Sequence, residues 1–425
     1  MPSRREGEQR YSIRVFRAPP AWRLKPCPFR AEGRGVTGSS ELVLGIDLGT
    51  TYSTAAVVLG GRLHFAVDGR GEAPIPSVVH FPRSGPPVVG ADAVKLRATD
   101  PENTVWGVKR IVGRSVDSPA ARLLDASAAF RIKAHPGEPE AAVVVRTGEH
   151  SATEVASLIL RHLRERAELR FGRRVGKAVI TVPVMATEAV REAMVRCGRM
   201  AGLEVVRIVP EPCAGAVARG MGAAGVGPAP VLVYDFGGGT LDATVVQRDG
   251  PRLRVLSTGG DDCLGGDDFD LAFARWIAAG VYRVHGIEVS KDAVLWDKVQ
   301  RQCELVKRAL SAAGEARFQI RDAFGVGGRA QHLDYVVRRE HLAPHWSELV
   351  DRSIASAAQT VAEAGLDGPA GLGAVLLIGG TTYVPQVRTG VAQAFARPCI
   401  MEDDPQTAVA RGAALLAADP SLLVE

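Results

Sequence analysis

The stretch Val43–Ser53 reads VLGIDLGTTYS, and the stretch Val231–Asp242, which begins 188 residues later, reads VLVYDFGGGTLD. Each is an apolar run that ends in Asp and is followed by a turn rich in Gly and Thr. This pattern is typical of a buried strand that enters a tight hairpin, where glycine lets a ligand approach the backbone. Two copies in one chain predict a duplicated domain whose halves close on one ligand.

Both turns are suited to hold phosphate, because successive backbone amides in such a turn form a cradle for an anion. Asp47 and Asp235 stand at the ends of the apolar runs, where a carboxylate can hold a hydrated Mg²⁺. A single Asp-x-Gly turn is more often structural than functional. The repetition favours a nucleotide cleft, with Mg²⁺ held by Asp47 and Asp235 through water.

Length and charge limit the class of protein. A chain of 425 residues, 46% hydrophobic and 23% charged, can bury the cores of two lobes. Its net charge is +5, but the first 35 residues hold nine Arg or Lys and three Glu, so the other 390 residues carry −1. Nucleic-acid binding by the folded part is therefore not expected.

The sequence also bears on location. No apolar run approaches the ~18 residues of a membrane span, so no membrane partner is expected. The Arg-rich start lacks the apolar segment of a secretory signal, and the six cysteines are widely spread without a Cys-x-x-Cys pair. Together these features predict a cytoplasmic protein with buried, reduced thiols.

The order of patterns predicts the domain organisation. Residues 1–40 are basic and lack periodicity, which indicates a disordered extension or a misassigned start with the true start near Val36. Strands then alternate with helices twice, which predicts an α/β architecture. Lobe I is expected over residues 41–225 with a peripheral insertion at about 78–150. Lobe II is expected over 226–399 with an insertion at about 266–345, and a helix at 400–418 returns to lobe I.

Several elements can be predicted individually. Ser151 and Glu154 form a capping box that begins a long helix. We expect a second helix in NTVWGVKRIVGR, the stretch that carries Lys109. A long helical region is expected over Asp268–Ser311, and another helix over Asp404–Ala417.

Seven motifs occur along the chain in a characteristic order. They are GIDLGTTYS at 45–53, NTVWGVKRIVGR at 103–114, EPCAGA at 211–216, YDFGGGTLD at 234–242, LGGDDFD at 264–270, IGGTTYVP at 378–385 and DPQTAVARGAA at 404–414. Over Leu42–Ala417 the chain resembles the ATPase domain of the DnaK-type 70-kDa heat-shock (Hsp70) chaperones. The resemblance implies an actin-like ATPase fold of two lobes around a cleft, with ATP or ADP, Mg²⁺ and K⁺ as ligands. It also implies co-chaperones or a separate chaperone as partners.

The resemblance assigns roles to particular residues. Lys109 would contact the γ-phosphate and the attacking water, and Glu211 would orient that water. The implied catalytic set is Asp47, Lys109, Glu211, Asp235 and Thr240. The implied nucleotide contacts are Gly49, Thr50, Thr51, Tyr52, Gly237, Gly238, Gly239, Gly265, Gly266, Asp267, Glu304, Lys307, Ser311, Gly379, Gly380 and Tyr383.

The nucleoside contacts are also favoured by spacing. Glu304, Lys307 and Ser311 stand at i, i+3 and i+7, so they share one helix face. The ordinary alternative is an ion pair on a solvated face. The match to the family's nucleoside-binding positions favours contact with ribose and adenine.

The sequence departs from the family in several places, which include Cys213 in place of a usual Thr and the segment VMATE after Pro183, which lacks the usual aromatic pair. Tyr383 stands where members usually carry an Arg beside the adenine, so the base would be stacked without the cation. The segment 419–425 (DPSLLVE) resembles the start of an interdomain linker, and no peptide-binding domain follows in the sequence. A slow Mg·ATP hydrolase related to chaperones is therefore the first interpretation. The alternatives are a non-catalytic, nucleotide-dependent regulator of a full-length chaperone and, further off, a sugar kinase or a filament-forming actin relative.

The start of the chain can be tested directly. If translation begins near Val36, mass spectrometry of the native protein will find no peptide from Tyr11–Arg23. Peptides from the folded part, such as those around Ala152–Phe171, serve as the control. A peptide that covers Tyr11–Arg23 would contradict the downstream start.

Overall fold

The computed structural model describes residues 41–137, 139–220, 229–249, 252–402 and 404–424. The expectations for residues 1–40 lie outside this range, as does Cys27. Among the described cysteines, Cys197, Cys213 and Cys303 are buried free thiols, as predicted, whereas Cys263 and Cys399 are half-buried. None of the described helices combines the length and the apolar character that a membrane crossing requires.

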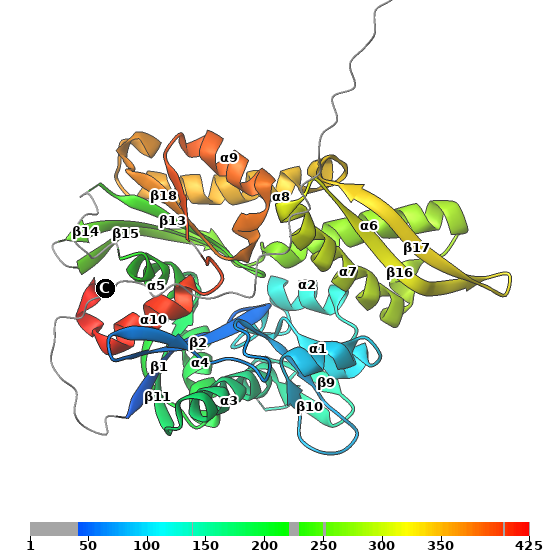
Figure 1. Cartoon of the computed structure of the whole chain (residues 1–425), viewed down its shortest axis with the longest axis horizontal. Coiled ribbons are helices and arrows are strands. Elements are labelled where there is room, and N and C mark those ends of the chain that lie inside the picture. The colour runs from blue at the N-terminus through cyan, green and yellow to red at the C-terminus, as the bar shows by residue number, and fades with distance from the viewer. Residues whose placement is uncertain (1–40, 138, 221–228, 250–251, 403, 425) are drawn as a thin grey trace, which may run out of the picture.

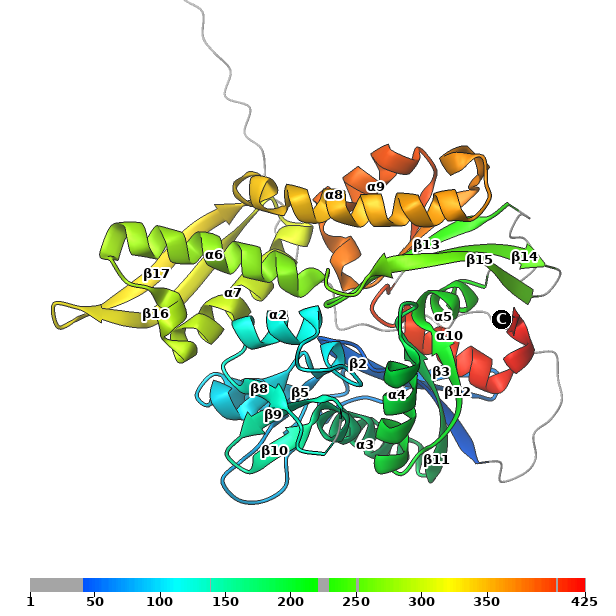
Figure 2. The same ribbon diagram turned by 180° about the vertical axis from the view of Figure 1, so that it is seen from behind.

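The first sheet has strand order β12-β11-β1-β2-β3, with β4 paired to β2. β1 runs parallel to β11 and antiparallel to β2. Helices α3 and α4 pack on one face of the sheet, and α10 packs on the other (Figure 2). Its strands are β1 (Leu42–Asp47), β2 (Tyr52–Leu59), β3 (Arg62–Phe65), β4 (Ile75–Pro76), β11 (Val175–Val182) and β12 (Glu204–Pro210).

The second sheet repeats this plan, with order β19-β18-β13-β14-β15-β20. β13 is parallel to β18 and antiparallel to β14, as β1 is to β11 and β2. The equivalent strand order supports the predicted duplication. The strands are β13 (Val231–Phe236), β14 (Leu241–Asp249), β15 (Arg252–Asp261), β18 (Ala374–Ile378), β19 (Cys399–Met401) and β20 (Leu423–Val424).

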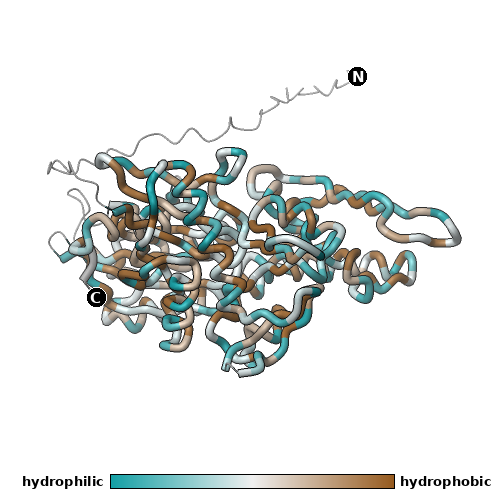
Figure 3. The backbone as a smooth tube through the Cα atoms, turned by 90° about the horizontal axis from the view of Figure 1, so that it is seen from below, coloured by the Kyte–Doolittle hydropathy of each residue, from teal (hydrophilic) through white to brown (hydrophobic). Residues whose placement is uncertain are grey.

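Each sheet carries a peripheral part inserted between equivalent strands (Figure 1). In the first half the insertion comprises β5 (Val78–His80), β6 (Val88–Val89), α1 (Ala91–Arg97), β7 (Thr104–Trp106), α2 (Pro119–Ser127), β8 (Arg131–Ala134), β9 (Ala141–Val145) and β10 (Gly148–Ser151). In the second half it comprises α6 (Gly266–His285), α7 (Ala293–Ala312), β16 (Glu315–Val326) and β17 (Arg329–Arg338). The β16–β17 hairpin projects from the body in Figures 1 and 3. We call the elements from β1 to α5 lobe I and those from β13 to β19 lobe II; the residue bounds proposed for these lobes from the sequence stay a prediction.

The remaining helices cover the sheets or join them. Apolar segments, brown in Figure 3, gather inside the body. α8 packs on β14 and β15, whereas α5 and α10 lie between the two sheets (Figure 1). One apolar cluster therefore combines residues of α5, α10 and both sheets. These helices are α3 (Ala152–Phe171), α4 (Glu188–Met200), α5 (Glu211–Ala218), α8 (Arg339–Glu363), α9 (Pro385–Phe395) and α10 (Ala408–Ala418).

Small residues make the contact between α5 and α10 possible. A Cβ atom on Gly412 would lie 1.7 Å from the carbonyl oxygen of Ala214, and one on Gly45 would lie 2.0 Å from the backbone nitrogen of Ala414. Real Cβ atoms never come this close to backbone. The glycines therefore let α10 touch both α5 and β1, which connects the base of lobe I to helix α10.

Three predicted elements differ in the structure. The stretch around Lys109 forms only a 3-10 turn, Val108–Arg110, because Gly107 and Gly113 on either side adopt positive φ angles of 68° and 66°. The long helical region is split, since Gly286, at φ 69°, ends α6 before α7 begins. The helix predicted over 404–417 begins only at Ala408, and part of the segment 400–418 is strand β19. The capping box at the start of α3 is confirmed.

We predict that Gly412→Ala destabilises the fold, because its methyl group would collide with the backbone of α5. We expect a loss of about 1–3 kcal/mol or more in the free energy of unfolding, measured by denaturant titration. Gly280→Ala is the matched control, since a Cβ at Gly280 in α6 meets nothing within 4 Å. That substitution should stabilise the helix by about 0.5–1 kcal/mol. Equal stability of the two variants would contradict the packing argument.

Candidate active site

The carboxyl ends of the parallel strands of both sheets point into one cleft. β1 ends at Asp47, and β12 runs directly into Glu211, the first residue of α5. Asp235 lies at the end of β13, beside the turn that follows β18. In α/β folds, ligands bind at the carboxyl ends of strands. The fold itself therefore brings together acids that are far apart in the sequence.

The cleft contains about 860 Å³ of space between its atoms, part of which is open to solvent. Most of the residues predicted from the sequence line it. They are Asp47, Gly49, Thr50, Thr51, Tyr52, Lys109, Glu211, Asp235, Gly237, Gly238, Thr240, Gly266, Asp267, Glu304, Lys307, Gly379 and Gly380.

Four predicted residues do not line the cleft. A Cβ on Gly239 would lie 2.5 Å from Thr50 Oγ1 of the first hairpin, and one on Gly265 would lie 2.4 Å from the carbonyl carbon of Gly238. Both glycines are therefore packed against protein atoms. The Ser311 hydroxyl donates to the Lys307 carbonyl, 3.2 Å away along the same helix. Tyr383 ends the 3-10 turn Gly380–Tyr383. Their assignment to the nucleotide stays a prediction.

The structure adds lining residues that the sequence reasoning missed: Asp270, Arg308, Thr381, Pro405, Gln406 and Val409. Arg308 could have been found, because it stands four residues after Glu304 and so shares its helix face. No sequence pattern indicated Asp270. It lies on α6, and only the folded structure brings its Oδ2 atom to 2.6 Å from Lys307 Nζ on α7.

The two glycine hairpins face each other across the cleft. The Gly237 amide donates to the Thr240 carbonyl at 2.9 Å and closes the second hairpin. A Cβ on Gly238 would lie only 2.0 Å from Thr51 Oγ1 of the first hairpin. Thr51 Oγ1 also donates to Asp267 Oδ1 at 3.3 Å. The hairpins therefore approach so closely that a side chain on Gly238 would collide with the opposite lobe.

Lys109 lies at the floor of the cleft and forms a buried ion pair. Its Nζ is 2.5 Å from Glu211 Oε1, and the two side chains are only 6% and 7% exposed. Burial lowers the pKa of Lys109, but the charges of Glu211 and Asp47 together raise it above its usual value. The lysine therefore stays protonated. Its positive charge lowers the pKa values of the neighbouring Asp47, Asp235 and Asp242 and so favours their ionised forms.

The surrounding carboxylates exceed this single positive charge. Burial and, less strongly, the charge of Glu211 raise the pKa of Asp47 to about 7, although Lys109 acts in the opposite direction. Burial together with the nearby acids Glu211 and Asp242 raises the pKa of Asp235 well above its usual range. Burial also raises the pKa of Asp242 to about 7, against the hydrogen bond from the Val184 amide. An excess of buried carboxyl groups is typical of a site that receives a cation.

This donor set fits a hydrated Mg²⁺. The buried Oδ2 atom of Asp242 has no hydrogen-bond partner, and Asp47 and Asp235 lie nearby as oxygen donors. In the described part of the chain, no three His, Cys, Asp or Glu side chains are placed to ligate a metal directly. A cation held through its water molecules, as expected for Mg²⁺, is compatible with both observations.

Polar contacts also cross the side of the cleft that is lined by Tyr52, Glu304 and Arg308. The Tyr52 hydroxyl lies 3.5 Å from Glu304 Oε1 and accepts a hydrogen bond from Arg308 at 2.6 Å. The Arg308 guanidinium also lies 5.5 Å from the centre of the Tyr52 ring. Lys307 donates to the Gly266 carbonyl at 2.6 Å. A flat cation and an aromatic ring therefore border the space expected for the base.

Two α/β lobes of the same plan, with facing glycine hairpins over an acidic cleft, define an actin-like ATPase fold. The family model described as Hsp70 protein matches residues 43–419, and the chain belongs to the Hsp70 family. Heat shock 70 kDa protein BIP3 from Oryza sativa subsp. japonica is 35% identical over 379 residues, which cover 88% of this chain and 56% of that protein. Mitochondrial-type heat shock protein 70 from Encephalitozoon hellem is 34% identical over 376 residues, which cover 88% of this chain and 63% of that protein. The chain thus spans between half and two thirds of the length of these relatives.

We predict that Asp242→Asn stabilises the metal-free, nucleotide-free protein in EDTA. The pKa of Asp242 rises from 3.8 to about 7 on folding, so the wild type loses stability as the pH rises from about 4 through about 7. The amide does not titrate and can still accept from the Val184 amide. We expect a melting temperature higher by roughly 5 °C at pH 8, with a smaller gain at pH 5.

Asp249→Asn is the control, because Asp249 is an exposed carboxylate at the far end of the same strand. It should leave the melting temperature nearly unchanged at both pH values. A gain from Asp242→Asn that is the same at pH 5 and pH 8 would show that relief of charge is not its cause.

Proposed function

We propose that the cleft binds Mg·ATP and hydrolyses it slowly, as the ATPase part of a chaperone-type protein. The observation that supports this most strongly is the buried Lys109–Glu211 pair, 2.5 Å long, on the floor of the cleft. It lies where the two glycine hairpins meet, among the carboxylates of Asp47 and Asp235. Membership of a family of chaperone ATPases agrees with this assignment.

The chain's own residues supply positioning and charge. Amides of the Gly49 and Gly237–Gly239 turns would hold the phosphate oxygens, as glycine-rich turns hold anions. Lys109 Nζ would donate to a phosphate oxygen and to the attacking water, while Glu211 would accept from that water. Mg²⁺ would neutralise phosphate charge, with Asp47 and Asp235 holding its water ligands. Phosphoryl transfer depends mainly on such positioning and electrostatics.

The base would lie beside Arg308 and Tyr52, with ribose contacts from Glu304 and Lys307. Burial and the charge of Asp404 raise the pKa of the Tyr383 phenol to about 12, although Tyr383 lies close enough to Arg308 for the guanidinium charge to lower it. A base bordered by one guanidinium and aromatic rings keeps a cationic stacking partner. The change of the usual Arg to Tyr383 is therefore compatible with adenine binding.

Partners and location are part of the proposal. The two relatives carry heat-shock names, and family membership supports co-chaperones or a separate chaperone as partners. We propose that the ligand of this cleft is a nucleotide. We do not expect the protein to bind a membrane or nucleic acid. The cytoplasmic location stays a prediction, which cell fractionation would test.

A single-turnover assay with ATP tests the hydrolysis. We predict that Lys109→Ala lowers the cleavage rate by about 100- to 1000-fold, because the phosphate and the water lose their positive partner. Lys95→Ala is the control, since Lys95 is an exposed lysine 63% accessible to solvent. Its cleavage rate should match that of the wild type.

Lys109→Ala leaves Glu211 buried without its partner and can destabilise the fold. The double variant Lys109→Met with Glu211→Gln removes both charges and provides a second test. Folded variants that cleave ATP at the parental rate would refute the assignment. Tight ATP binding by the wild type without cleavage would instead support a non-catalytic regulator.

A further inference from the structure

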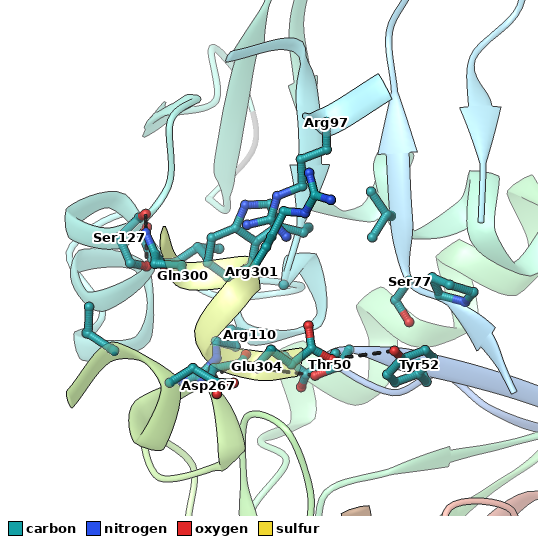
Figure 4. A pocket seen from close by; sticks show the side chains of 18 of the residues that line it. Thr50, Tyr52, Ser77, Arg97, Arg110, Ser127, Asp267, Gln300, Arg301 and Glu304 are labelled. Carbon is teal, nitrogen blue, oxygen red and sulfur yellow. Dashed lines mark hydrogen bonds and ion pairs between the residues drawn. The ribbon is translucent and has the colours of Figure 1, made fainter. Parts of the chain in front are cut away.

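A second cavity adjoins the proposed nucleotide cleft and lies between the peripheral parts of the two lobes (Figure 4). It contains about 1130 Å³ of space between its atoms, part of which is open to solvent, and it shares seven lining residues with the cleft: Thr50, Thr51, Tyr52, Asp267, Asp270, Glu304 and Arg308. Lobe I contributes residues of α1, β7 and α2, and lobe II contributes residues of α6 and α7. Of the residues that line this cavity, the proposed function uses only those shared with the cleft, and it assigns no role to Arg97, Trp106, Arg301 or Leu305.

One cation in this cavity has no partner. Arg301, on α7, is half-buried and makes neither a hydrogen bond nor an ion pair with any residue that the structure describes. Burial lowers its pKa, and the nearby guanidinium of Arg97 lowers it further, although Asp297 acts in the opposite direction. Figure 4 shows Arg301 and Arg97 together on the wall of the cavity.

The acids around Arg301 already have partners. Asp297 is 2.6 Å from Arg97, and Glu304 is engaged by Tyr52 and Arg308. Asp270 is paired with Lys307, and Asp267 and Asp268 face the buried Arg110. Since an unpaired charge that is partly removed from water is costly, an anion that enters the cavity gains from contact with Arg301.

One part of the wall is apolar. Arg97 lies 4.4 Å from the ring centre of Trp106, and its charge is taken up by Asp297. Val94, Leu124 and Leu305 also line the cavity, and Leu305 is 55% exposed. A ligand that fits both parts of the wall combines an anionic group with an apolar body.

We propose that this cavity is a second ligand site, for a small amphipathic anion whose charged group pairs with Arg301 and whose apolar body packs against Trp106 and Leu305. Such a ligand touches α7 of lobe II and α1 and β7 of lobe I at once. It binds best when the lobes are closed together. By linkage it therefore strengthens nucleotide binding and slows nucleotide release, a consequence that rests on the proposed function.

Anilinonaphthalene sulfonate is a suitable probe, because it joins an anion to an apolar ring system and fluoresces when it is bound. We expect saturable binding to the wild type without nucleotide, and Arg301→Gln should weaken it about 10- to 100-fold. Phenylnaphthylamine, which has the rings without the sulfonate, should bind both proteins equally. Lys298→Gln is the matched control, since Lys298 lies on the same helix outside the cavity, and it should bind the probe like the wild type.

The second arm repeats the titration with saturating ADP. Tighter probe binding supports a site that is separate from the nucleotide cleft and linked to it. Unchanged binding would contradict the linkage, and loss of the probe on ADP addition would overturn the proposal. Equal affinity of Arg301→Gln and the wild type would also overturn it. Because the first arm needs no nucleotide, it still tests the site if the proposed ATPase function fails.

Discussion

The close contact of α10 with α5 and β1 is the constraint on which the rest of the structure depends. Gly412 lies against the backbone of Ala214, and Gly45 lies against the backbone of Ala414. On its other side α5 also meets lobe II, where a Cβ on Gly215 would lie 2.3 Å from Ile378 Cδ1. A pair of helices made of small residues therefore joins both sheets, and it fixes how their carboxyl ends face each other.

This joint also places the chemistry. Glu211 is the first residue of α5, and Asp47 is the last residue of β1, the strand against which α10 packs. The position of α5 thus determines where the partner of Lys109 lies. Ionisation of these carboxyl groups is unfavourable in the folded protein. Burial and neighbouring acids raise the pKa values of Asp47, Asp235 and Asp242. Binding sites commonly keep such unfavourable groups because the ligand compensates for them.

The sequence predicted the parts of the site that follow from local pattern. The apolar run, the acid and the glycine turn occur twice, so Asp47, Asp235 and both hairpins were accessible from the sequence. Arg308 follows from helical spacing once Glu304 is chosen. The turn that carries Lys109 was wrongly predicted as a helix, because Gly107 and Gly113 act through their φ angles and not through periodicity.

Other features depend on contacts that no local pattern reveals. Arg97 and Asp297 are separated by 200 residues, yet they form a pair in which the side chains are 12% and 4% exposed. Arg110 of lobe I likewise reaches Asp267, Asp268 and the Gly238 carbonyl of lobe II. Only the folded arrangement of the two lobes brings these groups together, so the residues that cross the cleft could not be found by reading each lobe separately.

These crossing contacts have a common physical consequence. Each joins a lobe I group to a lobe II group in a partly buried place, so each is made only while the lobes are closed. The Gly238 carbonyl that accepts from Arg110 belongs to the same hairpin whose amides would hold phosphate. Ordering of that hairpin is therefore linked to closure, because movement of lobe II away from lobe I removes the Arg110 contact as well as the facing Thr51 turn. Phosphate bound to this hairpin, as proposed, would therefore favour lobe closure, and closure would in turn favour phosphate binding.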